Sequence, residues 1–458
     1  MEPINVSEIA FAVKGERFNC AEDFIIKGVT TDSRKIKSGD LFIPISGENF
    51  DGHDFIYSAL EAGAVLVLSE KNLNKENTPY IKVKSTKDAL MDLAAYYRSK
   101  FNIPAVAITG SSGKTTTKEM IAAVLGESLH VLKNEGNYNN TIGLPLTVFN
   151  LKKSHDICVL EMGMNSFGEI EKLASIVKPD IAVITNIGTA HIEYLGSREN
   201  ILKAKTEILE YFTSKNTLIL NGDDDMLVNI KDKNFNIIKI GLKNENNINA
   251  FDIMQIEDKG MEFSVHIGND VESFYIPLIG AHNVYNGLCA IAVGLCMGMS
   301  MEKIKHGLSN FISPRMRMET YELENGIKVI NDAYNANPQS MAAAMEVLIN
   351  LHCKGRRVLV LGDMLELGVH SEDEHYKIGC LAVKKGIDIL IAVGKKAEAI
   401  ARGALENGML KSNVFHFEDN LHAISEIWNI LLPMDSVLIK GSRVMKMEEI
   451  AHFLQERR

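Results

Sequence analysis

The stretch that decides the fold is Ala105-Val-Ala-Ile-Thr-Gly-Ser-Ser-Gly-Lys-Thr-Thr116. Its apolar half, Ala105 to Thr109, predicts a buried strand, and the residues from Lys114 to Ser128 predict a helix. The glycines between them let the backbone turn tightly and aim N–H groups inward, beside the positive end of the helix dipole. A strand, a glycine turn and a helix in this order are typical of a phosphate-binding loop.

This loop predicts the binding of ATP and Mg²⁺. Lys114 can reach the β- and γ-phosphates, and the hydroxyl of Thr115 can bind the metal ion. The loop is shorter than the general G-x-x-x-x-G-K-[ST] pattern, because Gly110 lies three residues before Gly113 instead of five. A glycine-rich turn without a ligand is the alternative, and the coincidence of strand, turn, lysine and threonine disfavours it. The predicted ATP-binding residues of the loop are Gly110, Ser111, Ser112, Gly113, Lys114, Thr115 and Thr116.

Two later strands end in further candidate residues. Asp156 to Leu160 runs into Glu161, and Asp180 to Thr185 is followed by His191. Because open α/β sheets bind ligands at the carboxyl ends of their strands, both side chains are expected near the phosphate loop. Alone, such a glutamate is more often a helix cap and such a histidine a packed residue. Their common position beside the loop favours a role in binding Mg²⁺.

The alternation of strands and helices from Ile103 onwards predicts an α/β fold with a mostly parallel, doubly wound sheet. A chain of 458 residues suggests about three domains, and changes in texture place their boundaries near residues 100 and 314. The predicted domains are therefore 1–100, 101–313 and 314–458, the last with a Rossmann-like α/β pattern.

Several local predictions complete the outline. Residues 248–280 have a β-rich texture that predicts a small antiparallel insertion, and a long helix is expected from Asn283. Pro338 is expected at the first position of a helix, and Ser371-Glu-Asp-Glu374 predicts a capping box. The lysines of the helical stretch 200–207 are predicted to form a solvated face.

The composition limits the classes of binding partner and the cellular compartment that we expect. The formal net charge is −10, from 49 basic and 59 acidic residues, so nucleic acid and anionic membranes are not expected as partners. No apolar stretch is long enough to span a membrane, and the N-terminus lacks the pattern of a signal peptide. Scattered cysteines without a C-x-x-C pair predict reduced core residues in a cytoplasmic protein. These cysteines are Cys20, Cys158, Cys289, Cys296, Cys353 and Cys380. A monomer is the default expectation for the oligomeric state.

Taken together, the motifs resemble the Mur ligases along nearly the whole chain. The shortened phosphate loop, Glu161-Met-Gly163, Thr185-Asn-Ile-Gly-Thr-Ala-His191 and Gly280-Ala-His-Asn283 are similar to that family's motifs. Finer features favour the branch that adds a D-alanyl-D-alanine dipeptide. They are Gly136-Asn-Tyr-Asn-Asn140, Asn331-Asp-Ala-Tyr-Asn-Ala-Asn-Pro-Gln-Ser-Met341, Gly362-Asp-Met-Leu-Glu-Leu-Gly368 and Lys440-Gly-Ser-Arg443.

The resemblance implies an ATP-dependent amide-bond ligase of cell-wall synthesis. Such an enzyme would join D-alanyl-D-alanine to UDP-N-acetylmuramoyl-tripeptide through an acyl phosphate, with Mg²⁺ as cofactor. Its three domains would bind the UDP-sugar, ATP and the incoming dipeptide, in that order along the chain. The alternatives are another ligase of the superfamily, such as a folate polyglutamate synthetase, a phosphate-loop switch or motor, and an inactive UDP-sugar-binding protein.

The resemblance also implies residue roles. Thr115, Glu161 and His191 would bind Mg²⁺, together with a carbamylated lysine for which Lys205 is the best match and Lys203 the alternative. The implied catalytic residues are Lys114, Glu161, His191, Lys205, Arg317 and Asp332, with Arg315 as the alternative to Arg317. Asn283 and Asn286 would contact adenine, and Arg317 and Asp332 the rest of ATP. The UDP group would contact Asp32-Ser33-Arg34 and Gly47-Glu48, and the remaining implied substrate contacts are Asn137, Asn139, Asn140, Tyr334, Asn335 and Asn337.

Overall fold

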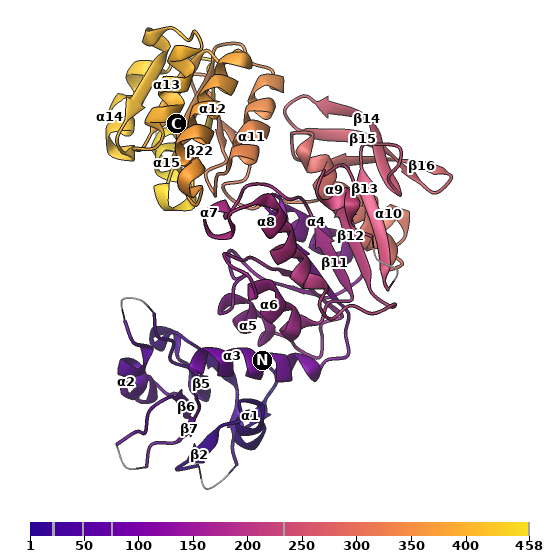
Figure 1. Ribbon diagram of the computed structural model, residues 1–458, viewed down its shortest axis with the longest axis vertical. Helices are drawn as coiled ribbons and strands as arrows, with labels where there is room; N and C mark the ends of the chain where they lie inside the picture. The colour runs from indigo at the N-terminus through magenta and orange to yellow at the C-terminus, as the bar shows by residue number, and fades with distance from the viewer. Residues whose placement is uncertain (21–22, 48–49, 75–76, 232–233, 457–458) are drawn as a thin grey trace.

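The computed structural model describes residues 1–20, 23–47, 50–74, 77–231 and 234–456. It consists of three α/β units that follow one another along the chain, each built on its own sheet (Figure 1). The predicted α/β class is confirmed. Here the units are called first, central and last.

The first unit holds a five-stranded sheet with the order β2-β7-β6-β5-β4, parallel except for β2. Its helix α3 (Thr86–Ser99) packs against α5 (Gly143–Val148) and α6 (Glu169–Val177) of the central unit. One apolar core therefore runs from the first unit into the central one. The other elements are β1 (Ile4–Asn5), α1 (Val6–Ala12), β2 (Glu16–Phe18), β3 (Ile25–Ile26), β4 (Gly28–Thr30), β5 (Asp40–Phe42), α2 (Ile56–Glu61), β6 (Leu66–Ser69) and β7 (Tyr80–Lys82).

The central unit is built on a nine-stranded sheet with the order β16-β15-β14-β13-β12-β11-β8-β10-β9. Strands β8 to β14 are parallel to one another, whereas β15 runs antiparallel to both of its neighbours, β14 and β16. The antiparallel segment predicted at 248–280 is present, and it extends this sheet at one edge. The strands are β8 (Ala105–Thr109), β9 (Val131–Lys133), β10 (Ile157–Glu161), β11 (Ile181–Ile184), β12 (Thr217–Asn221), β13 (Asn236–Gly241), β14 (Ile248–Ile256), β15 (Gly260–Ile267) and β16 (Asp270–Ile276).

Strand β8 lies between β10 and β11, so the segments that follow these three strands meet at one edge of the sheet. This is the place where α/β sheets bind their ligands. The remaining helices of the unit are α4 (Lys114–Gly126), α7 (Ile192–Leu195), α8 (Arg198–Thr206), α9 (His282–Cys296) and α10 (Met301–Ser309). Helix α9 is the predicted long helix near Asn283, and most of its residues are buried.

The last unit has a six-stranded sheet with the order β17-β18-β22-β19-β20-β21, parallel except for β17. Helices cover both faces, with separate apolar cores on the two sides. The elements are β17 (Glu319–Glu322), β18 (Lys328–Asn331), α11 (Pro338–Asn350), β19 (Arg357–Gly362), α12 (Ser371–Lys384), β20 (Ile389–Val393), α13 (Glu398–Glu406), β21 (Val414–Phe417), α14 (Asn420–Ile430), β22 (Ser436–Lys440) and α15 (Glu448–Gln455).

The two predicted helix starts in this unit have different outcomes. Pro338 is the first residue of α11, and Asn337 caps the helix by accepting a hydrogen bond from the N–H of Ser340. The capping box predicted at Ser371 is wrong, because α12 begins at Ser371 itself with His370 at the N-cap. The 3-10 turn Gly368–His370 has already given the backbone helical angles there, so the extended conformation that an N-cap needs is missing.

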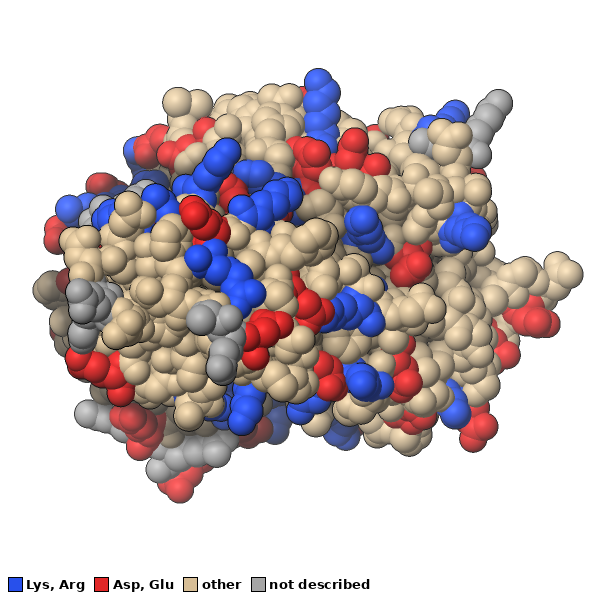
Figure 2. All heavy atoms as spheres, turned by 90° about the horizontal axis from the view of Figure 1, so that it is seen from below, with Lys and Arg blue, Asp and Glu red and all other residues tan. Residues whose placement is uncertain are grey.

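The charged side chains do not separate by sign on the face drawn in Figure 2, where basic and acidic side chains are interspersed. All six cysteines are free, but only Cys20, Cys158 and Cys289 are buried, so the prediction of core residues is wrong for the other three. Within the described ranges, no helix combines the length and the apolar character that crossing a membrane requires.

Candidate active site

A cavity of about 880 Å³ lies at the carboxyl ends of the central strands, between the central and last units. Most of the predicted site residues line it. From the central unit these are Ser111, Ser112, Gly113, Lys114, Thr115, Thr116, Asn137, Asn139, Asn140, Glu161, His191, Asn283 and Asn286, and from the last unit Arg317, Asp332, Tyr334, Asn335 and Asn337. Gly110, Lys205, Ser33 and Arg34 are not among its lining residues.

The phosphate loop has the backbone shape that its glycines predict. Gly110 and Gly113 have φ angles of 150° and 79°. A Cβ atom at Gly110 would lie 1.8 Å from Thr185 Oγ1, so a side chain cannot fit there. Gly113 stands at the N-cap of α4 and has no side chain to cap it. The N-terminal N–H groups of this helix therefore face the cavity as a site for an anion.

The segment that follows β11 supports the loop. The N–H groups of Ser111 and Ser112 donate to the carbonyl and side-chain oxygens of Asn186, both at 3.0 Å. The hydroxyl of Thr185 donates to the Ser112 carbonyl at 2.6 Å. The Thr-Asn-Ile-Gly motif thus holds the loop in shape, a role that the sequence did not reveal.

Oxygen atoms suited to a hard cation lie at the start of α4. Thr115 Oγ1 is 2.8 Å from Glu161 Oε2, and Asn139 Nδ2 donates to Glu161 Oε1 at 2.7 Å. A hydroxyl and a carboxylate beside a phosphate loop fit Mg²⁺, which takes few protein oxygens and completes its shell with water and phosphate. The described residues contain no cluster of three or more histidine, cysteine or acidic side chains arranged for a metal.

His191 faces the last unit as well as the cavity. Its Nδ1 lies 2.7 Å from Glu366 Oε2, and this contact lowers the pKa of Glu366 below its usual range. Sequence reasoning placed His191 at the correct edge of the sheet but missed Glu366, which comes from a different unit.

Lys205 lies beneath the phosphate loop and is only 1% exposed. Its Nζ donates to the Gly110 carbonyl at 2.9 Å, and Lys114 Nζ donates to the same oxygen at 2.8 Å. Burial, and secondarily the charge of Lys114, lower the pKa of Lys205 well below the usual lysine range. The prediction of a solvated lysine face is wrong at Lys205, whereas Lys203 is exposed.

The last unit contributes a cationic side of the cavity. Arg317 Nη2 donates to Thr115 Oγ1 at 2.9 Å, and its guanidinium lies 4.2 Å from the centre of the Tyr334 ring. Arg315 is exposed and is not a lining residue. Asp332 Oδ2 accepts a hydrogen bond from Lys440 Nζ at 2.5 Å. Lys440 was not predicted as a site residue, although its Lys-Gly-Ser-Arg motif was a signal.

Several of the predicted asparagines hold local structure. Asn140 Oδ1 accepts from the N–H groups of Ile142 and Gly143, and Asn337 caps α11. In α9, Asn283 Nδ2 donates to the Ile279 carbonyl at 2.8 Å. Asn283 Oδ1 accepts from Asn286 Nδ2 at 2.9 Å, and Asn286 Oδ1 accepts from the hydroxyl of Thr117. Their ligand-binding roles stay predictions, and hydrogen bonds within the protein already fix these side chains.

His282, beside these asparagines, also lines the cavity and was not predicted as a site residue. Burial lowers its pKa to about 4, so its ring is neutral at neutral pH. His282 therefore carries no positive charge that would repel the cationic groups of the last unit.

Ser33 and Arg34 lie in the first unit, on the 3-10 turn Ser33–Lys35 after β4. The Arg34 side chain is 86% exposed, and its guanidinium lowers the pKa of Asp32 to about 2. Glu48, the other predicted UDP contact beside Gly47, lies outside the described residues. The UDP assignments therefore stay predictions.

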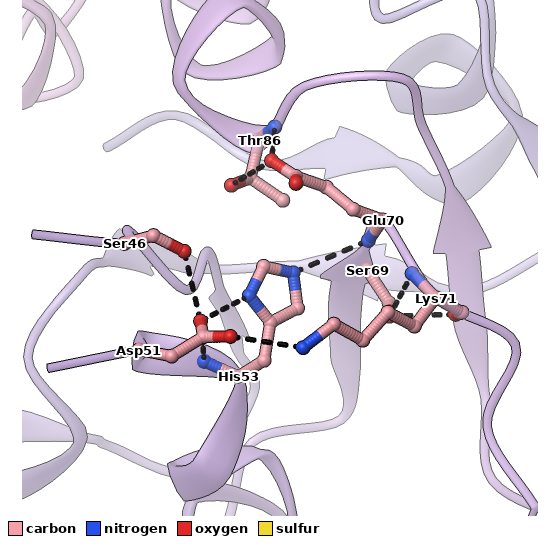
Figure 3. Close-up of polar contacts among 7 residues, drawn as sticks. All are labelled: Ser46, Asp51, His53, Ser69, Glu70, Lys71 and Thr86. Atoms are coloured by element: carbon pink, nitrogen blue, oxygen red, sulfur yellow. Dashed lines mark hydrogen bonds and ion pairs between the residues drawn. The ribbon is translucent and has the colours of Figure 1, made fainter.

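A polar network in the same unit organises the loop after β5 (Figure 3). The Asp51 carboxylate accepts hydrogen bonds from the N–H and Nδ1 of His53, and also from Ser46 and Lys71. His53 Nε2 accepts from the N–H of Glu70 at 3.2 Å. These donors hold the pKa of Asp51 well below its usual range, and the backbone N–H of His53 has the largest effect. The network ties the loop to the end of β6.

Replacing Asp51 with asparagine is expected to loosen this loop. The loss of a charged acceptor for several donors costs about 1–2 kcal/mol of local stability. Amide exchange of the full-length protein at pH 7, measured over residues 50–56 and 66–71, should therefore become about 5–30-fold faster. Because the pKa is lower in the folded state, the stabilisation is present above the unfolded value of about 3.9 and is lost as the pH falls below it.

Asp54→Asn is the matched control, because it removes the same charge from an exposed residue of the 3-10 turn Gly52–Phe55, which Asp51 caps. Equal exchange in the two variants at pH 7 would contradict the role given to Asp51.

Family models cover most of the chain. The Mur ligase middle domain matches residues 108–294, and the model described as Mur ligase, glutamate ligase domain matches 316–443. The model described as Mur ligase family, catalytic domain matches 25–98. The matched segments correspond to the central, last and first units.

Curated relatives match over the full length. The UDP-N-acetylmuramoyl-tripeptide–D-alanyl-D-alanine ligase of Bacillus subtilis is 41% identical over 455 residues, covering 98% of each chain. The ligase of the same name from Escherichia coli is 35% identical over 462 residues, covering 100% of this chain and 99% of the relative.

Solved structures agree with the fold. MurF from Acinetobacter baumannii superposes with a TM-score of 0.93 at 32% identity, covering 100% of this chain and 99% of that one. MurF ligase from Thermotoga maritima, solved in complex with ADP, has a TM-score of 0.84 at 28% identity, covering 94% and 97%. From its motifs, its three units and these full-length matches, we conclude that the protein belongs to the Mur ligase family.

Proposed function

We propose that this protein uses ATP to join D-alanyl-D-alanine to UDP-N-acetylmuramoyl-tripeptide, giving ADP, phosphate and the UDP-muramoyl-pentapeptide of peptidoglycan synthesis. The observation that carries the proposal is the 41% identity, over 98% of both chains, to a ligase of that name. The phosphate loop and the cationic residues around one cavity support it, because they supply what phosphoryl transfer from ATP requires.

The first step is the activation of the tripeptide carboxylate. Its oxygen attacks the γ-phosphorus of ATP, the bond from that phosphorus to the bridging oxygen breaks, and ADP leaves. Lys114 and the N-terminus of α4 stabilise the negative charge on the transferring group, and Arg317 adds a second cation from the last unit. The product is an acyl phosphate, which has a good leaving group.

The second step forms the amide. The amine of D-alanyl-D-alanine attacks the acyl carbon, and the tetrahedral intermediate expels phosphate while the nitrogen loses a proton. Arg317 and Asp332 border the cavity from the last unit, so docking of that unit would exclude water and protect the acyl phosphate from hydrolysis.

Thr115 and Glu161 would hold Mg²⁺, which when bound supplies further positive charge against the triphosphate. His191 is the third proposed ligand. Lys205 completes the set if its amine is carbamylated. The lowered pKa favours the neutral amine, whose nitrogen can add to CO₂ and lose a proton to give a carbamate. The modification would turn a buried amine into a carboxylate-like oxygen ligand.

The division of labour follows the three units. We propose that residues 1–100 bind the UDP-sugar with the help of Ser33 and Arg34, that 101–313 bind ATP, and that 314–458 bind the dipeptide. Asn283 and Asn286 are the proposed adenine-side residues. The proposed contacts to the peptide substrates are Asn137, Asn139, Asn140, Tyr334, Asn335 and Asn337. The protein acts on small molecules, and we propose that it does so as a cytoplasmic monomer.

Phosphate release tests the function. Purified protein with ATP and Mg²⁺ is given UDP-muramoyl-tripeptide, D-alanyl-D-alanine, both or neither. The expected result is release that requires both substrates, together with a UDP-pentapeptide detected by mass. Release that ignores the dipeptide would reject the proposal in favour of a phosphate-loop switch or another acceptor amine.

A further inference from the structure

The Lys-Gly-Ser-Arg motif begins at the end of β22, the strand that lies between β18 and β19 in the sheet of the last unit (Figure 1). Its first and last residues, Lys440 and Arg443, both line the cavity. The N–H of Ser442 donates to the Asp363 carbonyl at 3.0 Å, and Ser442 Oγ accepts from the N–H of Leu365 at 2.9 Å. These bonds fix the backbone before Arg443 at the carboxyl edge of the sheet, where α/β units bind their ligands.

Arg443 differs from the other cations that the last unit places in the cavity. Lys440 is buried, and its ammonium donates to Asp332 Oδ2 at 2.5 Å, to the Asn335 carbonyl at 2.9 Å and to the Asp332 carbonyl at 3.4 Å. An ammonium has three N–H groups, so Lys440 has none left for a ligand. Arg317 reaches the start of α4, where it is proposed to act on the transferring phosphoryl group.

The Arg443 side chain is half exposed and keeps most of its donors. Within the described ranges its polar contacts are with Glu448 Oε1, at 2.5 Å, and with the sulfur of Met316, at 3.8 Å, and both use Nη1. The Glu448 side chain is only 13% exposed, so this ion pair orients the guanidinium against α15. Nε and Nη2 are left to donate side by side, in the geometry that binds a carboxylate through both of its oxygens.

The proposed reaction requires such a group. D-alanyl-D-alanine carries one full negative charge, on its terminal carboxylate, whereas its amine has to reach the acyl phosphate. An extended dipeptide spans about 6–7 Å, so its carboxylate lies beyond the groups that act on the phosphoryl transfer. Arg443 has this relation to them, because it contacts Met316, the residue before Arg317. Burial raises the pKa of Tyr334, and the charges of Arg317 and Arg443 both oppose this effect, so both cations lie near that ring.

We propose that Arg443 binds the terminal carboxylate of the incoming dipeptide and so selects acceptors in which that carboxylate is free. The inference rests on the proposed ligase function and names a specificity-determining residue of the same site. With its carboxylate on Arg443, the dipeptide would direct its amine towards Arg317 and the acyl carbon. The cations of the last unit would then divide the work between the two substrates.

The test compares D-alanyl-D-alanine with its C-terminal amide, which keeps the amine and lacks the negative charge. In the wild type we expect kcat/KM to be about 10–100-fold lower for the amide, the usual effect of losing hydrogen bonds to a charged group. In Arg443→Ala, kcat/KM for the dipeptide should fall by a similar factor, mainly through KM, and the amide should hardly be affected. The ratio of the two acceptors then approaches one. Arg443→Lys should keep part of the preference, because it retains the charge but loses the paired donors.

The ratio separates recognition from a structural effect. Both acceptors are measured on the same preparation, so any inactive protein cancels. Arg443→Ala combined with Glu448→Gln avoids leaving an unpaired carboxylate and should give the same ratio as Arg443→Ala. Arg402→Ala is the matched control: it removes an arginine of the last unit that pairs with Glu372 and does not line the cavity, and it should keep the wild-type ratio.

Three outcomes decide against the inference while the proposed function stands. They are equal kcat/KM for dipeptide and amide in the wild type, an unchanged ratio in Arg443→Ala, and a rise in KM that is confined to ATP. A wild type that forms no UDP-pentapeptide from D-alanyl-D-alanine rejects the proposed function, and the inference with it.

Discussion

Replacing Lys114 with alanine is expected to lower kcat for UDP-pentapeptide formation by about 10³-fold or more, since one preorganised charge at a transferring phosphoryl group is worth that much. The Lys114 side chain donates a hydrogen bond to the Gly110 carbonyl of the phosphate loop, and Lys114 is the first residue of α4. Without Lys114, the negative charge that develops on the transferring group loses the cation of the phosphate loop.

The measurement is substrate-dependent phosphate release, with the product identified by mass. The fold should be preserved, because the Gly110 carbonyl keeps its hydrogen bond from Lys205. Lys172→Ala, an exposed lysine of α6, serves as the control and should retain normal kinetics. Near-normal turnover in Lys114→Ala would reject the phosphate-loop assignment.

Replacing Lys205 with alanine is expected to lower kcat by about 10²–10³-fold, of the order seen when a single preorganised group is lost from a reaction centre. Added short carboxylates such as formate or acetate should restore part of the activity. The physical reason is that the buried lysine would act through a carbamate, and a small carboxylate that enters the space left by the side chain supplies similar oxygen atoms.

Lys203→Ala is a closely matched control, because Lys203 is on the same helix two residues away and is exposed. It should show normal activity with no response to carboxylates. Loss of activity in Lys205→Ala that no short carboxylate relieves would count against the carbamate and favour a purely structural lysine beneath the loop.

The sequence by itself determined the elements around the phosphate loop. Ala105–Thr109 is a strand with the predicted bounds, α4 begins at the predicted Lys114, and Glu161 and His191 lie at the expected edge of the sheet. These features follow from local rules, since apolar runs specify buried strands and parallel strands bring their carboxyl ends together. The resemblance to the Mur ligases, which also rests on local motifs, gave the family that the comparisons confirm.

Only the tertiary structure decided which side chains meet. Lys205 belongs to a polar helix whose pattern predicts a solvated face, yet it lies buried under a loop 95 residues away. Arg317 reaches Thr115 across 202 positions, and Lys440 pairs with Asp332 across 108. Glu366 meets His191 only because two units dock. Such contacts depend on how distant segments pack, and a periodic pattern along the chain reports which face of an element is apolar but not which partner will cover it.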